Sequence, residues 1–376
     1  MHVSTRSIVV AALTLCVSQA IRAQHVTHES PEQYRASRSL TLTQQAAWCA
    51  AADTKGCDYK QISDAIALPD GGILMFDLKG PINRFDKSGK FVGALSRIGR
   101  GPGEFRYIAA PQLLKSGSLA WFDQGTMRIT TLALDGTPGP VHALRLPTGV
   151  LHIGIAQGEL VVLQVPPGKA SGDNVQGIYT TVVDSGTARV LHTVSTPSVF
   201  APGAMMRELP PLFSPQVVTS IGWAGDIAHA NGADYSINVR TAASTTYSLQ
   251  VEWSPVLVTS AEKDHAIQES LHDANVKSVA ELPEMIRHSI EGARKTLPAL
   301  SEMRMLRDGT LWIRPSVLSS APRARWDVFT HDGKRAGHVM LPSKAIVVDG
   351  ERDWVLVVEP GIDDVPKVVR YLVKRA

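Results

Sequence analysis

Two stretches of this 376-residue chain are near copies of one another. Residues 68–77 (Leu-Pro-Asp-Gly-Gly-Ile-Leu-Met-Phe-Asp) and residues 114–123 (Leu-Lys-Ser-Gly-Ser-Leu-Ala-Trp-Phe-Asp) each suggest a strand, a turn at glycine and a second strand, and they begin 46 residues apart. Self-similarity at about 40 to 50 residues is typical of four-stranded blades arranged around an axis. The repeat therefore predicts an all-β chain folded as a β-propeller.

The hairpin glycine recurs along the chain and gives the number of blades. Each copy lies between two β-rich or apolar runs, at Gly71, Gly117, Gly158, Gly225, Gly309 and Gly350. A second turn of the Asp-Gly or Ser-Gly kind follows several of the predicted third strands, as at residues 135–136 and 332–333. Six glycines predict six blades, over residues 60–376.

Two features fall outside the blade pattern. Thr259 and Ser278 begin sequences that resemble capping boxes, which predicts helices over about 260–274 and 283–295 within a helical insert at about 260–298. Residues 24–59 form an N-terminal segment with a short β-like run at 39–43. An open ring would leave two unpaired sheet edges, so we expect this run to supply the outermost strand of the last blade.

The first 23 residues have the pattern of a secretory signal peptide. Arg6 precedes an apolar run at residues 8–17, and small residues precede a cut after Ala23. Ten apolar residues are too few to span a bilayer, which needs about 20, so no transmembrane segment is expected. The pattern predicts a periplasmic or secreted protein. A lipoprotein attached at Cys16 is the alternative, which the bulky Leu15 disfavours.

Removal of that segment leaves two cysteines and a nearly neutral chain. Cys49 and Cys57 have seven residues between them, and in an oxidising compartment we expect a disulfide; two buried thiols are the alternative. The formal charge of +3 becomes +1 without Arg6 and Arg22. Neither nucleic acid nor an anionic membrane is indicated as a partner, and we expect a monomer without a cofactor.

Between the two clearest repeats lies the run Arg-Ile-Gly-Arg-Gly-Pro-Gly-Glu-Phe, residues 97–105. In this context it resembles the signature loop of the exported bacterial six-bladed β-propeller proteins related to the NHL-repeat group. The resemblance covers about residues 60–376 and implies the fold, whereas an activity has to be argued from a site. The later blades depart from the pattern, since Pro315 occupies the position of Asp77 and Asp123 in the first two.

Charged side chains near one face of the ring are the candidate ligand-binding residues. Loops that join one blade to the next, and loops between second and third strands, open on the same face in this topology. That face is expected to carry Arg97, Arg100, Glu104, Arg106, Asp77, Arg84, Asp123 and Arg128. Arginines of this kind can bind an anionic group through paired hydrogen bonds. The alternative is structural, with Asp77 paired to Arg84 and Asp123 to Arg128.

Two further patterns have structural interpretations that we favour. The glycines of residues 97–105 suit a tight turn better than a phosphate-binding nest, because no Lys-Ser/Thr follows them. His265, Glu269 and His272 share one helix face, but the spacing lacks the His-Glu-x-x-His pattern, so we expect a solvated face and no metal. No nucleophile motif identifies a catalytic residue.

Three functions remain open from the sequence. The first is an exported binding or scaffold protein that takes a polar or anionic small molecule, glycan or peptide at the channel mouth. The second, implied by related propellers, is a metal-assisted hydrolase or lyase, lactonase-like or polysaccharide/peptide lyase-like, with Glu104 as ligand or base and Arg100 at an oxyanion. Carboxylates and histidines converging on the axis would favour the enzyme, and a rim of satisfied Arg–Asp pairs the binder. The third is a partner protein docked on Met285, Ile286 and Ile290.

Overall fold

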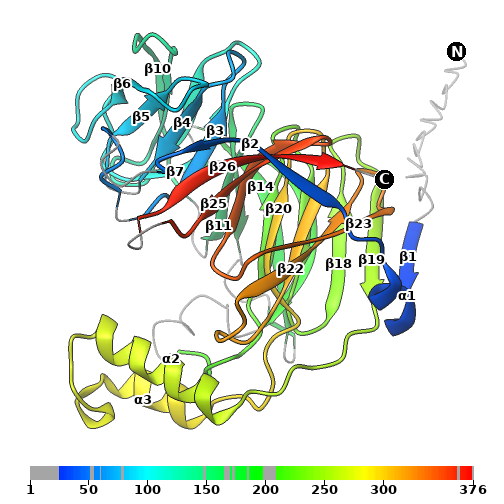
Figure 1. The fold of residues 1–376 in the computed structure, drawn as a ribbon. Helices are drawn as coiled ribbons and strands as arrows, with labels where there is room; N and C mark the ends of the chain where they lie inside the picture. The colour runs from blue at the N-terminus through cyan, green and yellow to red at the C-terminus, as the bar shows by residue number, and fades with distance from the viewer. Residues whose placement is uncertain are drawn as a thin grey trace, which may run out of the picture.

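The computed structural model describes residues 25–374, apart from 51–54, 60, 78–79, 147–149, 165–169, 172–173, 184–185, 198–208 and 362–364. Within these residues the chain forms six β-sheets, arranged as the blades of a six-bladed propeller (Figure 1). The predicted all-β fold with a small helical insert is confirmed. The predicted signal peptide, with Cys16, lies outside the described residues.

The first three blades follow one another in sequence. Blade 1 contains β3 (Asp64–Ala67), β4 (Ile73–Phe76), β5 (Ile82–Phe85) and β6 (Phe91–Ser96). Blade 2 contains β7 (Ile108–Leu113), β8 (Leu119–Asp123), β9 (Arg128–Leu132) and β10 (Pro138–Ala143). Blade 3 contains β11 (Val150–Ala156), β12 (Glu159–Gln164), β13 (Ala170–Ser171), β14 (Asn174–Val183) and β15 (Gly186–Pro197).

The other three blades include both ends of the described chain. Blade 4 contains β16 (Val218–Ile221), β17 (Ile227–Ala230), β18 (Tyr235–Arg240) and β19 (Thr246–Val251). Blade 5 contains β20 (Leu300–Met305), β21 (Leu311–Pro315), β22 (Arg323–Phe329) and β23 (Arg335–Pro342). Blade 6 contains β24 (Ile346–Glu351), β25 (Trp354–Glu359), β26 (Lys367–Lys374) and, as its outermost strand, β2 (Thr41–Trp48).

The N-terminal segment crosses the outside of several blades before it closes the ring. β1 (His25–Glu29) pairs in parallel with β19 of blade 4, and α1 (Pro31–Ala36) follows it. Ser39 then bridges to His338 of blade 5, and β2 pairs antiparallel with β26. Cys49 and Cys57 form a disulfide after β2, with Cα atoms 5.5 Å apart. This segment therefore connects blades 4, 5 and 6 to blade 1.

Apolar side chains fill the spaces between neighbouring blades. β4 and β8 are buried along their whole length, because each middle strand has another blade on both of its faces. The cluster around Phe105 and Trp121 joins blades 1 and 2, and the cluster around Tyr235 and Leu249 joins blades 4 and 5. Burial of this kind is the main force that holds a propeller together.

The predicted turn glycines are confirmed at five of six positions. Gly71, Gly117, Gly158, Gly225 and Gly309 take positive φ angles between 78° and 100°, a conformation that costs glycine little. The sixth prediction is wrong, because Gly350 lies within β24 and the turn falls on Arg352 and Asp353.

The insert forms a small layer of its own beside the ring (Figure 1). It contains α2 (Ser260–Asp273), the 3-10 turn η2 (Val279–Glu281) and α3 (Glu284–Glu291). The Thr259 hydroxyl caps α2 by accepting a hydrogen bond from the Glu262 backbone nitrogen at 3.1 Å. Glu262 itself binds Ser319 of the loop between β21 and β22, which ties the insert to blade 5.

Candidate functional site

The signature loop at residues 97–105 binds its own glutamate. Glu104 Oε2 accepts a hydrogen bond from the Gly101 backbone nitrogen at 2.8 Å, and Glu104 Oε1 accepts one from Arg97 Nε at 2.8 Å. These bonds hold the pKa of the Glu104 carboxyl below its usual range. The glycines therefore form a turn around a carboxylate of the chain. Because the Glu104 carboxylate accepts two hydrogen bonds in its ionised form, it is a poor general base.

Asp123 fixes the same loop to blade 2. Its carboxylate is fully buried and accepts hydrogen bonds from the backbone nitrogens of Arg106 at 3.2 Å and Tyr107 at 3.1 Å. Arg128 lies 3.9 Å from the Asp123 carboxylate and donates to the Glu104 carbonyl oxygen at 3.0 Å. The structural alternative for Asp123 and Arg128 agrees with these contacts.

Arg84 does not reach the face on which we expected it. Its guanidinium donates to Asp70 at 2.7 Å and to the Leu134 carbonyl oxygen at 3.0 Å, and both partners lie in turns at the opposite end of the blades. The predicted pairing of Arg84 with Asp77 is therefore wrong. It fails because Arg84 lies near the far end of β5, one residue from its last position.

The innermost strands bring a different set of ionisable groups to the axis. They surround a cavity of about 240 Å³ between β3, β7, β11, β16 and β20. Its polar lining includes Asp64, His152, Thr219, Ser220 and Arg304. None of these residues was among the predicted site residues.

Arg304 and Asp64 form an ion pair across this cavity. Arg304 Nη2 lies 3.2 Å from each carboxylate oxygen of Asp64 and also donates to the Val348 carbonyl oxygen. Burial raises the pKa of Asp64 to about 6, against the opposing effect of Arg304. Burial acts to lower the pKa of Arg304, but the carboxylates of Asp64 and Asp349 outweigh it, so that pKa is raised.

A second ion pair lies at the end of the axis where the first and second strands of each blade turn. Arg307 Nε donates to Asp349 Oδ1 at 2.7 Å, and Arg307 Nη2 donates to the Ala67 carbonyl oxygen at 2.7 Å. The guanidinium lies 4.3 Å from the ring centre of Trp223 and 5.4 Å from that of Trp354. The guanidinium of Arg307 thus already has hydrogen-bond acceptors and two aromatic rings as partners within the chain.

The cavity also contains a neutral imidazole and an unusual backbone. Burial lowers the pKa of His152 to about 4, so His152 carries no charge at neutral pH. Ala110 has a φ angle of 48° directly before Pro111, in an irregular part of β7. Backbone conformations of this kind gather at functional sites, although they cost free energy.

The comparisons with known proteins support the fold. No family model matches the sequence, and the search of curated proteins found no significant relative. A solved structure of a DUF4221 family member from Bacteroides vulgatus is similar, with a TM-score of 0.51 and 10% identity, covering 90% of this chain and 99% of that one. At this level of identity the similarity is one of architecture.

Two other solved structures show weaker similarity. A candidate exported protein from Bacteroides fragilis matches with a TM-score of 0.46 and 11% identity, covering 94% of this chain and 100% of that one. A gluconolactonase from Xanthomonas campestris matches with a TM-score of 0.38 and 11% identity, covering 94% of this chain and 99% of that one. The function of this chain therefore has to be argued from its own residues.

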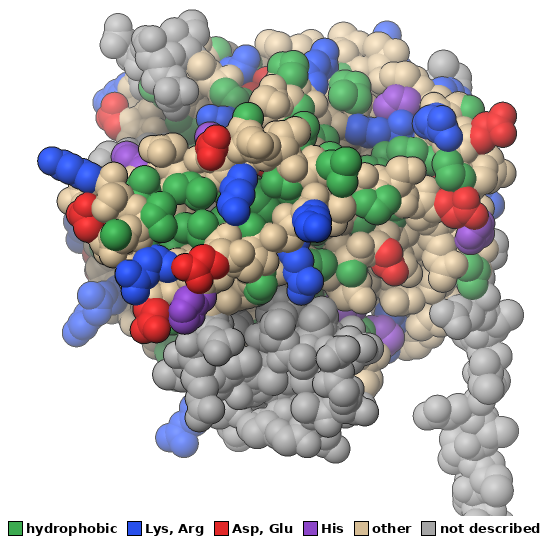
Figure 2. All heavy atoms as spheres, turned by 90° about the horizontal axis from the view of Figure 1, so that it is seen from below, with side chains coloured by type: hydrophobic (Ala, Val, Ile, Leu, Met, Phe, Trp, Pro, Cys, Tyr) green, Lys and Arg blue, Asp and Glu red, His purple; other side chains and the backbone are tan. Residues whose placement is uncertain are grey.

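The insert offers neither of the two sites considered for it. His265, Glu269 and His272 are exposed, and within the described part of the chain no three His, Cys, Asp or Glu side chains gather as metal ligands. A docked partner would need Met285, Ile286 and Ile290 to be exposed together, but Ile290 is 6% exposed and packs with Leu271 and Leu282. On the side where the insert lies, acidic and basic side chains are interspersed around a band of hydrophobic ones (Figure 2).

The axial residues carry a sequence signal that loop-based reasoning misses. Asp64 begins a short apolar strand, and Arg304 lies between Met303 and Met305 in another. A charged residue inside an innermost strand has to lie in a cavity or beside a counter-ion.

Among the described residues, no helix is long and apolar enough to cross a membrane.

Proposed function

We propose that this chain is an exported binding protein whose central channel takes a small molecule with a carboxylate or similar anionic group. The observation that carries the proposal is the position of Arg304. All of its hydrogen bonds to described residues leave from Nη2, so Nε and Nη1 remain available beside the cavity. A guanidinium fork with two available nitrogens suits a carboxylate.

The surroundings of Arg304 support this function. The Asp64 pair and the raised pKa of Arg304 keep the guanidinium charged and fixed in place. His152 is neutral and does not repel a cation or an anion, while Ser220 on β16 provides a hydroxyl group. A volume of about 240 Å³ suits a ligand of a few heavy atoms or the anionic end of a larger one.

The state of the other charges favours a binder over a metal-assisted enzyme. A carboxylate and a histidine, Asp64 and His152, do meet near the axis, as an enzyme would require. Asp64 and Asp349 are nevertheless each paired with an arginine, which is the arrangement of satisfied pairs expected for a binding protein. Export rests on the signal-peptide pattern of residues 1–23. We also propose that the chain is related to the NHL-repeat group of propellers, on the basis of residues 97–105 and the six-bladed fold.

The test is ligand binding by the chain that begins after residue 23. Succinate, gluconate and glucuronate are compared with glucose by thermal shift and calorimetry, since a ligand at ~100 times its Kd stabilises the native state by about 2.7 kcal/mol. We expect at least one anion to bind, Arg304→Gln to abolish the binding and Arg304→Lys to weaken it. The exposed Arg145→Gln is the matched control. Loss of binding in Arg100→Gln but not in Arg304→Gln would place the site at the signature loop and reject the proposal.

One observation favours an acid–base enzyme at the same cavity as the second candidate. The pKa of Asp64, about 6, places a carboxyl near its titration point at working pH, which suits a general acid or base. Glu104, the earlier candidate base, is held by the signature loop. If the enzyme hypothesis is correct, Asp64→Asn will abolish turnover of a bound anion or lactone while binding persists. A binding protein gives no turnover in either form.

A further inference from the structure

We propose that the cleft between blades 3 and 4 is a second ligand site, and that it takes a neutral, hydroxyl-rich molecule such as a saccharide. The cleft encloses about 400 Å³ between β15 and the strands β17, β18 and β19. A separate cavity of about 250 Å³ lies between the same two blades near Gln157 and Arg240, and it is not part of the proposed site. Small-molecule sites usually occupy roughly 300–1,000 Å³.

The sequence of β18 explains why the two blades do not close on each other. Its residues alternate strictly, and Tyr235, Ile237 and Val239 belong to the apolar core shared with blade 5. Ser236 and Asn238 therefore face blade 3. A polar strand face normally meets water, but here it meets another blade, so a cavity remains beside the apolar cluster of Leu163, Tyr179 and Ile227 that joins the two blades.

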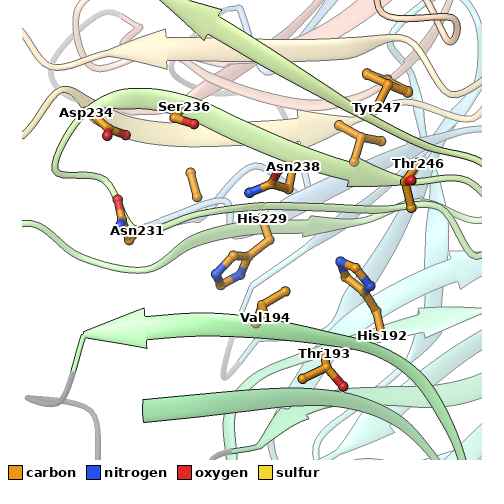
Figure 3. A pocket seen from close by; sticks show the side chains of 12 residues that line it. His192, Thr193, Val194, His229, Asn231, Asp234, Ser236, Asn238, Thr246 and Tyr247 are labelled. Carbon is orange, nitrogen blue, oxygen red and sulfur yellow. The ribbon is translucent and has the colours of Figure 1, made fainter. Parts of the chain in front are cut away.

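The polar groups converge on the cleft from both blades. Figure 3 shows the rings of His229 on β17 and His192 on β15 pointing into the gap from opposite sides. Asn231, Asp234 and Ser236 lie at one end of the cleft. Amides, hydroxyls and imidazoles of this kind donate and accept hydrogen bonds with the successive hydroxyls of a sugar.

A hydrogen-bond relay fixes the floor of the cleft. Thr219 donates to the Ala228 carbonyl oxygen at 2.9 Å, so its hydroxyl must accept from Tyr179. The Tyr179 oxygen then accepts from His229 Nδ1 at 3.0 Å, which assigns the proton of His229 to Nδ1. His192 stacks on the Tyr179 ring with the planes 20° apart. Both rings are thus held in place, as a preorganised site requires.

The charge of the lining argues for a neutral ligand. Asp234 is the single Asp, Glu, Lys or Arg among the described residues that line this cleft of about 400 Å³. Burial lowers the pKa of His192, and the Arg240 charge acts in the same direction, so His192 is neutral at pH 7. An anion gains no ion pair here. The amide oxygens of Asn231 and Asn238 already accept hydrogen bonds from Ala233 and Ser248, and an apolar molecule would offer no acceptor to their amide nitrogens.

The test follows the imidazole signals of the full mature chain by NMR while maltose, cellobiose or lactose is added at up to ~10 mM, ten-fold above a millimolar Kd. The His192→Gln variant lacks one imidazole signal, which identifies that signal as the one of His192. We expect the His192 signal to move and saturate with at least one disaccharide. Asn238→Leu should weaken binding at least tenfold, and Ser236→Trp, which fills the cleft, should abolish it.

Two controls keep the result specific to the cleft. Gln45→Leu makes a matched polar-to-apolar change at an exposed position of β2 on blade 6, and it should leave the affinity unchanged. Arg304→Gln should also leave it unchanged, which separates this site from the channel. The proposal fails if no disaccharide moves the His192 signal, or if Asn238→Leu and Ser236→Trp, shown folded by circular dichroism, bind as the original chain does.

Discussion

Glu104 Oε2 lies 2.8 Å from the Gly101 backbone nitrogen, so the signature loop closes around an anion that the chain itself supplies. A β-carbon added to Gly99 would lie 2.0 Å from the same carboxylate oxygen. Phe105, the next residue, is fully buried against Trp121 with the ring centres 6.1 Å apart. The glycines and the glutamate thus act together to seat Phe105 between blades 1 and 2.

Gly99→Ala is therefore expected to lower the urea midpoint of unfolding, because the new methyl group displaces the Glu104 carboxylate from its hydrogen bonds to Gly101 and Arg97. Urea denaturation followed by tryptophan fluorescence measures the change. Gly93→Ala is the matched control, since a β-carbon there meets no atom within 4 Å. Equal stability of the two variants would mean that the loop does not depend on the close contact.

The fold could be predicted because repeats report on architecture directly. Each blade needs the same hairpin, so Gly71 and Gly117 recur in similar surroundings. The first insert helix also matches, because Thr259 at its start is a local signal. The second begins as predicted but ends at Glu291, short of residue 295, and Ser278 precedes a 3-10 turn without capping it. The turn of blade 6 was misplaced because a glycine within a β-rich run does not by itself say whether it forms the turn or lies beside it.

The candidate site could not be predicted in the same way. Placing a residue in a loop predicts the end of the blade at which it lies, but it does not predict which atoms its side chain contacts. Asp123 accepts hydrogen bonds from backbone nitrogens at the end of the preceding signature loop, and Arg84 donates to a turn of the neighbouring blade. The meeting of Asp64 with Arg304 joins residues 240 positions apart, and only the closed ring brings them together.

The buried carboxyl of Asp64 is expected to make stability depend on pH. Its folded pKa of about 6 exceeds the ordinary value of 3.8, so the folded state binds the proton more tightly than the unfolded state. The contribution of Asp64 to stability is then greatest below about pH 4, falls by about 3 kcal/mol as pH rises from about 4 to 6, and changes little above pH 6.

Denaturation curves recorded from pH 4 to 7 give the free energy of unfolding at each pH. The contribution of Asp64 is the difference between the original chain and Asp64→Asn in the slope of this free energy against pH. Above about pH 6 the asparagine variant leaves Arg304 without a charged partner, whereas at lower pH the original carboxyl is itself largely protonated. The informative quantity is the slope. Parallel pH profiles for the two proteins would show that Asp64 titrates normally.

The disulfide between Cys49 and Cys57 stabilises the junction where the ring closes. Both cysteines are buried among residues of blades 6 and 1, including Trp48 and Met75. Closing so short a loop is worth about 2–3 kcal/mol through the unfolded state. The double variant Cys49→Ser, Cys57→Ser should lose that amount in urea denaturation, and reductant should affect the original chain alone. No loss in either experiment would contradict the prediction.

Glu29 of β1 is expected to hold the N-terminal segment against blade 5 through Arg335. The two side chains are 11% and 10% exposed, and Arg335 Nε donates to both Glu29 oxygens at 2.7 and 2.8 Å. Arg335 also binds Asp327 at 2.7 Å, so it remains charged when Glu29 is neutralised. Glu29→Gln should therefore cost about 3 kcal/mol, because it weakens a buried pair from one side.

Limited proteolysis gives a second measurement of the same contact. If β1 is held chiefly by Glu29, Glu29→Gln should expose the segment before α1 to cleavage while the blades stay intact. Glu32→Gln is the matched control, since Glu32 lies on the exposed side of α1. Equal cleavage of both variants would mean that the backbone pairing of β1 with β19 is sufficient, because parallel pairing persists without the side-chain ion pair.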